Sequence, residues 1–183
     1  IEDVRGDRGT RLLYATDASI YEMEPLAVVF PRSVEDVQHV VRVAAAQRIP
    51  VLTRGAGTSL AGQAINHAIV LDCSRHLNRV LEVNTEERWA RVEPGVVLDQ
   101  LSRAARPHRL QYGIDPATKN RATIGGGIGN NSCGAHSLIY GKTIDQVVSV
   151  DVVLADGSLA TFEAVEGAAL QDEFLRSDLR GEI

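Results

Sequence analysis

The stretch from Leu26 to Thr53 restricts the fold more than any other part of the sequence, because one helical pattern joins two apolar runs. Leu26 to Phe30 (LAVVF) is a continuous apolar run ended by a proline, which is the pattern of a buried strand. Ser33 is a good helix N-cap, and valines then recur at helical spacing, which predicts a helix ending at about Gln47. Ile49 to Thr53 is the second apolar run. A strand, a helix and a strand in this order indicate parallel strands joined by a right-handed crossover.

The chain after Thr53 predicts one more strand and then a change of pattern. Ala68 to Asp72 (AIVLD) is typical of a third strand of the same unit. Further along, short strands flank polar turns, which is typical of antiparallel hairpins. The elements expected there are a hairpin of residues 79–83 and 88–93, a helix over 97–105, and a second hairpin of residues 147–154 and 158–162 around Asp156-Gly157.

These patterns predict an α+β fold class, with a small parallel βαβ unit followed by a mainly antiparallel sheet with helices. At 183 residues, the chain is long enough for one domain or for two small subdomains that share a core. We expect an N-terminal arm over residues 1–24, a first subdomain over 25–76 and a second over 77–183. The chain begins without methionine and stops just after a helix-like polar stretch, so we expect it to be a piece of a longer polypeptide.

The composition argues against several classes of function. The net charge of −5 argues against nucleic-acid binding, which relies on a basic surface. No apolar run approaches the roughly 18 residues that cross a bilayer, so contact with a membrane is expected to be peripheral at most. Two cysteines are too few for a disulfide framework or a four-thiolate metal site, and we therefore expect a cytoplasmic location.

The first candidate site is the loop Arg54 to Gln63 (RGAGTSLAGQ), which follows the second predicted strand and contains no acidic residue. Gly55 and Gly57 allow the backbone to adopt positive φ and to approach a ligand closely. Successive N–H groups in such a loop form a concave anion nest, to which Thr58 and Ser59 add hydroxyl donors. The same composition also suits a tight turn without a ligand, and the glycine spacing matches neither the dinucleotide fingerprint nor the P-loop.

The second candidate site is the stretch Thr123 to Gly134 (TIGGGIGNNSCG), which is also free of acidic residues. It is suited to a short helix whose N-terminus attracts a phosphate. The alternative is a glycine-rich segment that only allows close packing. Two acid-free loops, both rich in hydrogen-bond donors, favour a ligand with two phosphates that lies between the subdomains.

Three other residues carry weaker signals. Arg54 is suited either to neutralising a phosphate or to a surface ion pair. Cys133 is either a small packed residue or a reactive thiol. His136 lies beside the second loop and is the one histidine that we consider for a ligand contact, because the histidines show no metal-ligand spacing. No Ser/His/Asp set can be assembled, so no catalytic residue is assigned.

The two loops and the chain around them resemble the FAD-binding domains of the vanillyl-alcohol oxidase/PCMH type, also called FAD-linked oxidases. The resemblance runs from about Leu12 to Phe162 and rests on PRSVEDV, RGAGTSLAGQ and DPATKNRATIGGGIGNNSCGAHSLIYGKTIDQVVSVDVVLADG. Within this family, the chain is most similar to the branch of glycolate oxidase subunits, D-lactate dehydrogenases and D-2-hydroxyglutarate dehydrogenases. It is particularly similar to large bacterial members that carry a C-terminal iron–sulfur domain.

The resemblance implies a two-subdomain, PCMH-type fold with FAD between the subdomains. It also implies that the whole protein oxidises a small 2-hydroxy acid, such as D-lactate, glycolate or D-2-hydroxyglutarate, and passes electrons from the flavin to an iron–sulfur partner. The first loop would hold the pyrophosphate. The residues that the resemblance assigns to FAD are Arg54, Gly55, Ala56, Gly57, Thr58, Ser59, Ala117, Thr118, Thr123, Gly125, Gly126, Asn130, Asn131, Ser132 and Cys133.

Several departures from the family pattern matter. Covalent members carry a histidine in the first loop or a cysteine just before the second; here Thr58 and Arg121-Ala122 stand there, so noncovalent FAD is expected. Ala56 replaces the usual middle glycine, which is tolerable if Ala56 keeps a negative φ. The family's later cofactor-contacting strand and its substrate domain, with the acid/base and metal-binding residues, do not occur in the sequence, so this piece alone is expected to be inactive. A flavoenzyme with other chemistry and a non-enzymatic module that binds a nucleotide diphosphate are the alternatives.

Overall fold

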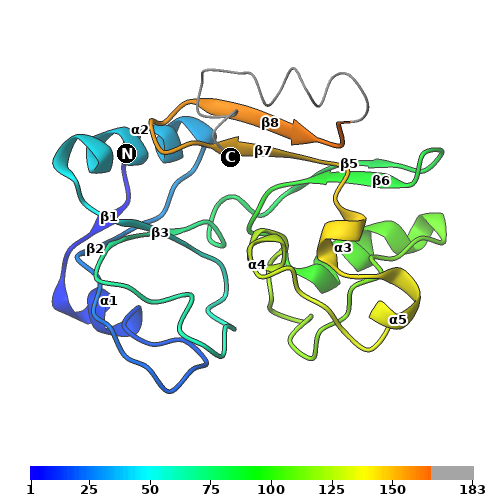
Figure 1. The fold of residues 1–183 in the computed structure, drawn as a ribbon, viewed down its shortest axis with the longest axis horizontal. Helices are drawn as coiled ribbons and strands as arrows, with labels where there is room; N and C mark the ends of the chain where they lie inside the picture. The colour runs from blue at the N-terminus through cyan, green and yellow to red at the C-terminus, as the bar shows by residue number, and fades with distance from the viewer. Residues whose placement is uncertain (166–183) are drawn as a thin grey trace.

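The computed structural model describes residues 1–165, and the predicted end of the second subdomain at residue 183 lies outside them. The described chain forms two lobes that lie side by side (Figure 1). The first lobe contains the elements up to Asp72 and the second contains those from Val80 onward, and the predicted boundary at residue 76 stays a prediction. The predicted arm of residues 1–24 lies in the first lobe, to which it contributes a strand and a helix.

A four-stranded sheet forms the centre of the first lobe. Its strands are β1 (Val4–Arg5), β2 (Ala27–Val29), β3 (Val51–Arg54) and β4 (Ile69–Asp72). The order is β1-β2-β4-β3, with β4 parallel to both of its neighbours and β1 antiparallel to β2. The predicted strands and their parallel orientation are therefore confirmed. However, β4 lies between the two strands that the crossover helix connects.

Both faces of this sheet are covered, because successive residues of a strand point to opposite sides. Helix α2 (Val34–Gln47) covers one face, and Tyr14, which ends helix α1 (Arg8–Leu13), packs on the other. The cluster between the sheet and α2 contains Val29, Val40 and Leu71. The cluster on the opposite face contains Val28, Phe30 and Val70. The predicted helix is confirmed at both ends, and the Ser33 side chain caps it by accepting a hydrogen bond from the backbone of Asp36.

The second lobe contains two hairpins and several short helices. Its elements are β5 (Val80–Asn84), β6 (Trp89–Val92), α3 (Leu98–Ala105), the 3-10 helix η1 (Arg106–His108), α4 (Ile124–Gly129), α5 (Ser137–Tyr140), the 3-10 helix η2 (Thr143–Gln146), β7 (Ser149–Val153) and β8 (Leu159–Glu163). Both predicted hairpins and the predicted helix over 97–105 are confirmed. Within residues 1–165, the hairpins form separate two-stranded sheets instead of one antiparallel sheet. An ion pair between Arg91 of β6 and Asp151 of β7, at 3.4 Å, spans the space between them.

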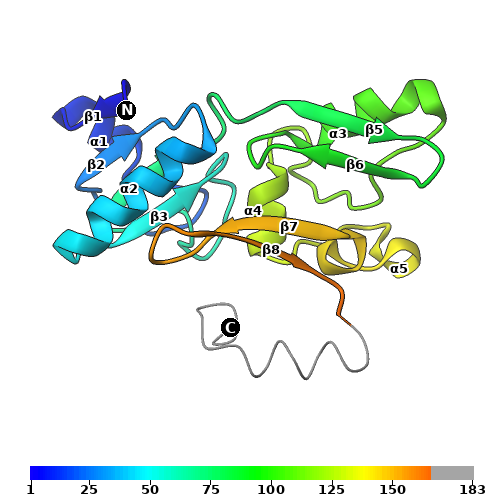
Figure 2. The ribbon, with the colours of Figure 1, turned by 90° about the horizontal axis from the view of Figure 1, so that it is seen from above.

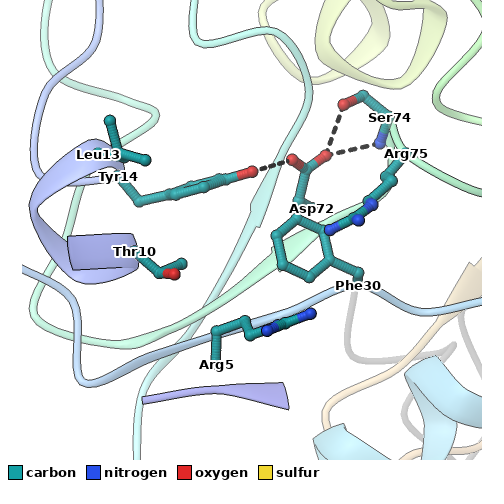
Figure 3. Close-up of a pocket in the computed structure, with 8 residues that line it drawn as sticks. All are labelled: Arg5, Thr10, Leu13, Tyr14, Phe30, Asp72, Ser74 and Arg75. Atoms are coloured by element: carbon teal, nitrogen blue, oxygen red, sulfur yellow. Dashed lines mark hydrogen bonds between the residues drawn. The ribbon is translucent and has the colours of Figure 1, made fainter. Parts of the chain in front are cut away.

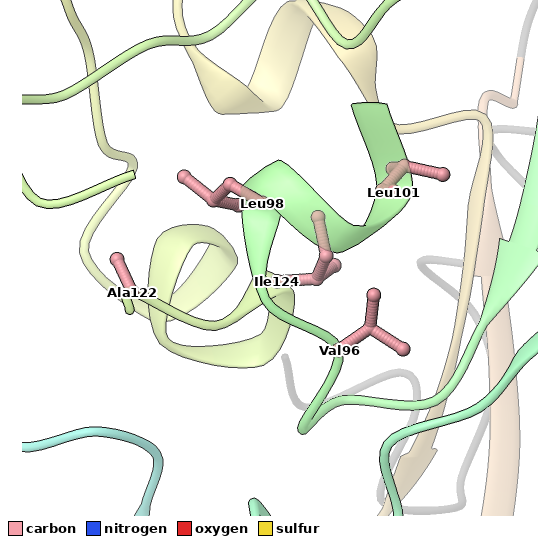
Figure 4. Packing of buried hydrophobic residues seen from close by; sticks show 5 residues of the cluster. All are labelled: Val96, Leu98, Leu101, Ala122 and Ile124. Atoms are coloured by element: carbon pink, nitrogen blue, oxygen red, sulfur yellow. The ribbon is translucent and has the colours of Figure 1, made fainter. Parts of the chain in front are cut away.

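The core of the second lobe packs helix α3 against the start of helix α4 (Figure 4). Its buried residues are Val96, Leu98, Leu101, Ala122 and Ile124. Backbone hydrogen bonds connect the same two segments, since the Leu98 N–H donates to the Ala122 carbonyl at 3.0 Å and the Ile124 N–H donates to the Val96 carbonyl at 2.8 Å. This packing fixes the position of Thr123, which lies between Ala122 and Ile124.

The β7–β8 hairpin extends from the second lobe to helix α2 of the first (Figure 2). At its turn, the Gly157 carbonyl accepts hydrogen bonds from Gln38 Nε2 at 2.8 Å and from an Arg42 guanidinium nitrogen at 3.1 Å. Gly157 has a φ of 79°, and a Cβ there would collide with the Arg42 side chain, so the turn needs glycine. The hairpin thus joins the two lobes. Within residues 1–165, no helix combines the length and apolar character needed to cross a bilayer.

Candidate cofactor site

The first glycine loop leaves strand β3 with its backbone donors unused. Within residues 1–165, the N–H groups of the five residues from Gly55 to Ser59 have no hydrogen-bond partner. Gly57 has a φ of 65°, whereas Ala56 is not among the residues with positive φ. The alanine that replaces the usual glycine therefore fits the backbone here. Successive unpaired N–H groups in a turn with a left-handed residue form the concave donor set that binds anions.

Arg54 fixes the shape of this loop through backbone carbonyls. Its guanidinium donates to the carbonyls of Ala64 at 2.8 Å, Thr16 at 2.9 Å and Tyr14 at 3.4 Å, and it lies 5.0 Å from the centre of the Tyr14 ring. A Cβ on Gly57 would meet this guanidinium at 2.5 Å. Arg54 is thus bonded to the protein backbone, and its predicted contact with a phosphate stays a prediction.

The second glycine stretch uses its donors differently. Helix α4 forms, and the Thr123 side chain caps it by accepting from the Gly126 N–H at 3.4 Å. The N–H groups of Ile124 and Gly125 donate to the carbonyls of Val96 and Pro94, both at 2.8 Å. A Cβ on Gly125 would lie 2.8 Å from the Pro94 side chain. The N–H groups at the start of helix α4 are therefore already bonded within the protein. The close-packing alternative fits this helix start better than the phosphate site does.

The structure brings the two stretches into contact. A Cβ on Gly55 would overlap the hydroxyl oxygen of Thr123, so only glycine allows this approach. Asn130, at the end of α4, donates from Nδ2 to the Ser59 hydroxyl at 3.4 Å. The two stretches therefore lie against each other where the two lobes meet.

The remaining predicted residues differ in how far they are exposed. The exposed ones are Ala117, Gly126, Asn130, Asn131 and Cys133. Thr118 and Ser132 are half-buried, and Thr123 is buried. Cys133 is a free, exposed cysteine, so the packed role considered for it is wrong. Asn131 has a φ of 45°, and its side-chain oxygen accepts from the Ile144 N–H at 3.0 Å.

The sequence does not predict a role for one residue of this region, Asp115. Asp115 accepts a hydrogen bond from the His136 backbone at 3.0 Å and is bonded to His136 Nδ1 at 2.5 Å. The backbone hydrogen bond, more than the imidazole, holds the pKa of Asp115 below its ordinary value. Asp115 precedes a proline and reads as an ordinary turn residue, since its partner lies 21 residues away along the chain.

A cavity of about 480 Å³ in the first lobe is lined by none of the predicted cofactor residues (Figure 3). It lies beside Tyr14, whose hydroxyl donates to Asp72 Oδ2 at 2.5 Å, while Ser74 donates to Oδ1 from its backbone at 2.8 Å and from its hydroxyl at 2.6 Å. Burial, and then the bond to Asp72, raise the pKa of Tyr14 well above its ordinary value. This network anchors the ring on which Arg54 stacks.

The same fold occurs in solved structures of other proteins. The chain superimposes on alkyldihydroxyacetonephosphate synthase with a TM-score of 0.76, at 24% identity, covering 88% of this chain and 31% of that one. It superimposes equally well, with a TM-score of 0.76 at 22% identity, on 6-hydroxy-D-nicotine oxidase from Arthrobacter nicotinovorans, covering 88% of this chain and 35% of that one. These likenesses confirm the α+β, PCMH-type fold.

The sequence comparison is more specific. Residues 25–163 match the model of the FAD binding domain family, and the chain belongs to that family. It is 47% identical over 161 residues to D-2-hydroxyglutarate dehydrogenase of Escherichia coli K12, covering 84% of this chain and 16% of that protein. It is 37% identical over 152 residues to glycolate oxidase subunit GlcD of Bacillus subtilis, covering 81% of this chain and 32% of that one. The chain thus spans less than a third of the length of either relative.

The residues present fit FAD, the cofactor of this family. The unpaired N–H groups of Gly55 to Ser59 and the hydroxyls of Thr58 and Ser59 are suited to a pyrophosphate. No carboxylate belongs to either glycine stretch. The assignment of individual residues to parts of FAD stays a prediction.

Proposed function

We propose that this chain is the FAD-binding part of a larger flavin-dependent oxidoreductase that oxidises a small 2-hydroxy acid. The observation that carries the proposal is the first loop, in which five backbone donors without a partner among residues 1–165 follow one another beside Thr123 in a member of the FAD binding domain family. The relatives named for D-2-hydroxyglutarate and glycolate oxidation support the substrate class.

The described residues would bind and orient the cofactor. Gly55 to Ser59 would hold the pyrophosphate by their N–H groups, with Arg54 keeping the loop open from behind. Ala117, Thr118 and Asn130 to Cys133 would contact the remainder. When bound, FAD supplies the acceptor for the hydride that leaves the substrate carbon. The groups that bind the substrate and remove its hydroxyl proton would lie elsewhere in the whole protein.

The same proposal covers the finer features of the protein. Thr58 and Arg121-Ala122 stand where covalent members carry their attachment residues, which supports noncovalent FAD. Onward electron transfer to an iron–sulfur partner and a cytoplasmic location rest on the sequence resemblance and the cysteine content alone. Precipitating the flavin-loaded protein with acid tests the attachment, because noncovalent FAD stays in the supernatant.

The test of function uses the full-length protein. We expect it to purify with flavin absorbance or to take up added FAD, and to bleach on anaerobic addition of D-lactate, glycolate or D-2-hydroxyglutarate. Thermal shifts with FAD, FMN, ADP and a UDP-sugar separate this outcome from a general nucleotide-diphosphate module. A colourless protein that takes up no FAD contradicts the proposal. Stabilisation by the UDP-sugar alone favours the binding module.

A further inference from the structure

The carboxylate of Asp115 joins two segments of the second lobe that are far apart in sequence. One oxygen accepts the His136 backbone N–H at 3.0 Å, and the other is bonded to the His136 ring at 2.5 Å. Gly134 lies so close that a Cβ there would collide with the Asp115 backbone. The two segments therefore touch directly, and glycine is needed for the approach.

Both segments lead into residues assigned to FAD. Asp115 comes two residues before Ala117, and His136 comes three residues after Cys133. The other hydrogen bonds of the stretch 131–134 run elsewhere: Ser132 and Asn131 bond to Thr143 and Ile144 of the η2 region. Among the described hydrogen bonds, the connection between residues 115–118 and 130–136 is made by Asp115.

The charges around Asp115 favour its ionised form. Lys119 and Arg106 line the small cavity beside Asp115 and His136, together with one other acid, Asp99. The pKa of Asp115 is lowered, first by the His136 backbone hydrogen bond. A lowered pKa means that this interaction stabilises the fold at all pH values above the ordinary range of an aspartate and is lost only as the pH falls below it. The carboxylate is therefore a fixed acceptor under physiological conditions.

We propose that the Asp115–His136 pair is a positioning device that holds residues 115–118 and 130–136 in the arrangement that binds FAD. This inference rests on the proposed function. Neither residue is among those assigned to the cofactor, so the pair acts through its neighbours. Without it, the segment ending at Cys133 and the segment starting at Ala117 each adopt their own conformations, and FAD binding has to order both.

The test measures FAD affinity by quenching of flavin fluorescence in the full-length protein, after removal of bound FAD. We expect Asp115→Ala to raise the Kd about 10-fold or more and His136→Ala to raise it several-fold. The double variant should bind no more weakly than Asp115→Ala, because the two changes break one interaction. Asp115→Asn keeps an oxygen acceptor for the His136 N–H and should bind within about 3-fold of the wild type.

The matched control is Asp7→Ala. Asp7 also accepts from a backbone N–H, that of Thr10 at 2.9 Å, and from a side chain, but both donors lie within its own turn in the first lobe. It should leave the Kd unchanged. Hydrogen exchange of the FAD-free protein gives a second readout, with faster exchange expected over residues 130–136 in Asp115→Ala and not in Asp115→Asn.

Two results overturn the inference while leaving the proposed function intact: wild-type affinity in both Asp115→Ala and His136→Ala, or additive losses in the double variant. If Asp115→Ala does not fold, His136→Ala decides the question, with an unchanged Kd counting against the pair. A wild-type protein that binds no FAD is a different outcome, which overturns the proposed function itself.

Discussion

The two glycine stretches have similar compositions but use their backbones in opposite ways. In the first, the N–H groups from Gly55 to Ser59 have no partner among residues 1–165, and Arg54 occupies nearby carbonyls. In the second, the N–H groups of Ile124 and Gly125 are bonded to the segment that precedes helix α3. A high glycine content shows that the backbone can approach a ligand or another part of the protein closely. In the second stretch the backbone approaches other parts of the protein, and for the first we propose that it approaches a ligand.

This difference follows from the surroundings of each stretch. The first loop follows β3, which lies at the edge of its sheet with β4 on one side only. The second stretch continues from Ala122, which is buried against helix α3, and the carbonyls of Pro94 and Val96 lie directly above its first turn. The first loop therefore keeps free donors for the anion that we propose, whereas the N–H groups of the second stretch are bonded within the protein.

The contact between the stretches is most severely tested by Gly55→Ala. The new methyl group would overlap the Thr123 hydroxyl. Thr123 is buried and caps the start of helix α4, so its side chain cannot move away. We expect a loss of about 3 kcal/mol in the free energy of unfolding, measured by urea denaturation, and loss of FAD binding.

Gly129→Ala is the matched control for that variant. Gly129 ends helix α4, and a Cβ there meets nothing within 4 Å. Since alanine favours helix more than glycine does, this change should leave stability unaltered or raise it by up to about 1 kcal/mol. Equal losses in the two variants would show that glycine flexibility, not the contact with Thr123, matters at position 55.

Arg54→Met tests whether the hydrogen bonds from Arg54 to backbone carbonyls hold the first loop in shape. Methionine retains the apolar stem but donates to none of the three carbonyls, and the Ala64 carbonyl belongs to a buried residue. We expect the FAD-free protein to lose about 2 kcal/mol of stability in urea denaturation. If Arg54 instead contacts phosphate, the FAD-free protein keeps its stability and only the FAD affinity falls. Arg42→Met, which removes one of two donors to Gly157, is the control.

The sequence predicts the elements of the fold better than it predicts their neighbours. The N-cap at Ser33, the end of α2 at Gln47 and both hairpins follow from local patterns, because caps and turns depend on nearby residues. The insertion of β4 between β2 and β3 depends on long-range pairing. The same holds for Arg54 and Asp115, whose partners lie up to 40 and 21 residues away. Residue type alone made Arg54 a phosphate candidate and gave Asp115 no role.

Tyr14→Phe tests the support of Arg54, whose guanidinium lies over the Tyr14 ring. The variant loses the hydroxyl that donates to buried Asp72, which should cost about 1.5 kcal/mol at neutral pH. The pKa of Tyr14 is raised on folding, so in the wild type its contribution is fully present below the ordinary tyrosine pKa of about 10 and is lost as the pH rises above it. Urea denaturation between pH 7 and 11 should show the two proteins converging. A constant difference would mean that Tyr14 does not ionise more readily in the unfolded chain.

The smallest effect is expected from Asn130→Ala, which removes the side-chain hydrogen bond between the stretches. This bond is long, at 3.4 Å, and joins two groups that water can solvate equally well. We expect the FAD-free protein to lose less than about 0.5 kcal/mol in urea denaturation, and Ser59→Ala to behave alike. The comparison with Gly55→Ala then separates the two contacts: a loss above about 1 kcal/mol in Asn130→Ala would mean that the hydrogen bond holds the stretches together. A small loss leaves the packing of Gly55 on Thr123 as the contact that joins the first loop to the second stretch.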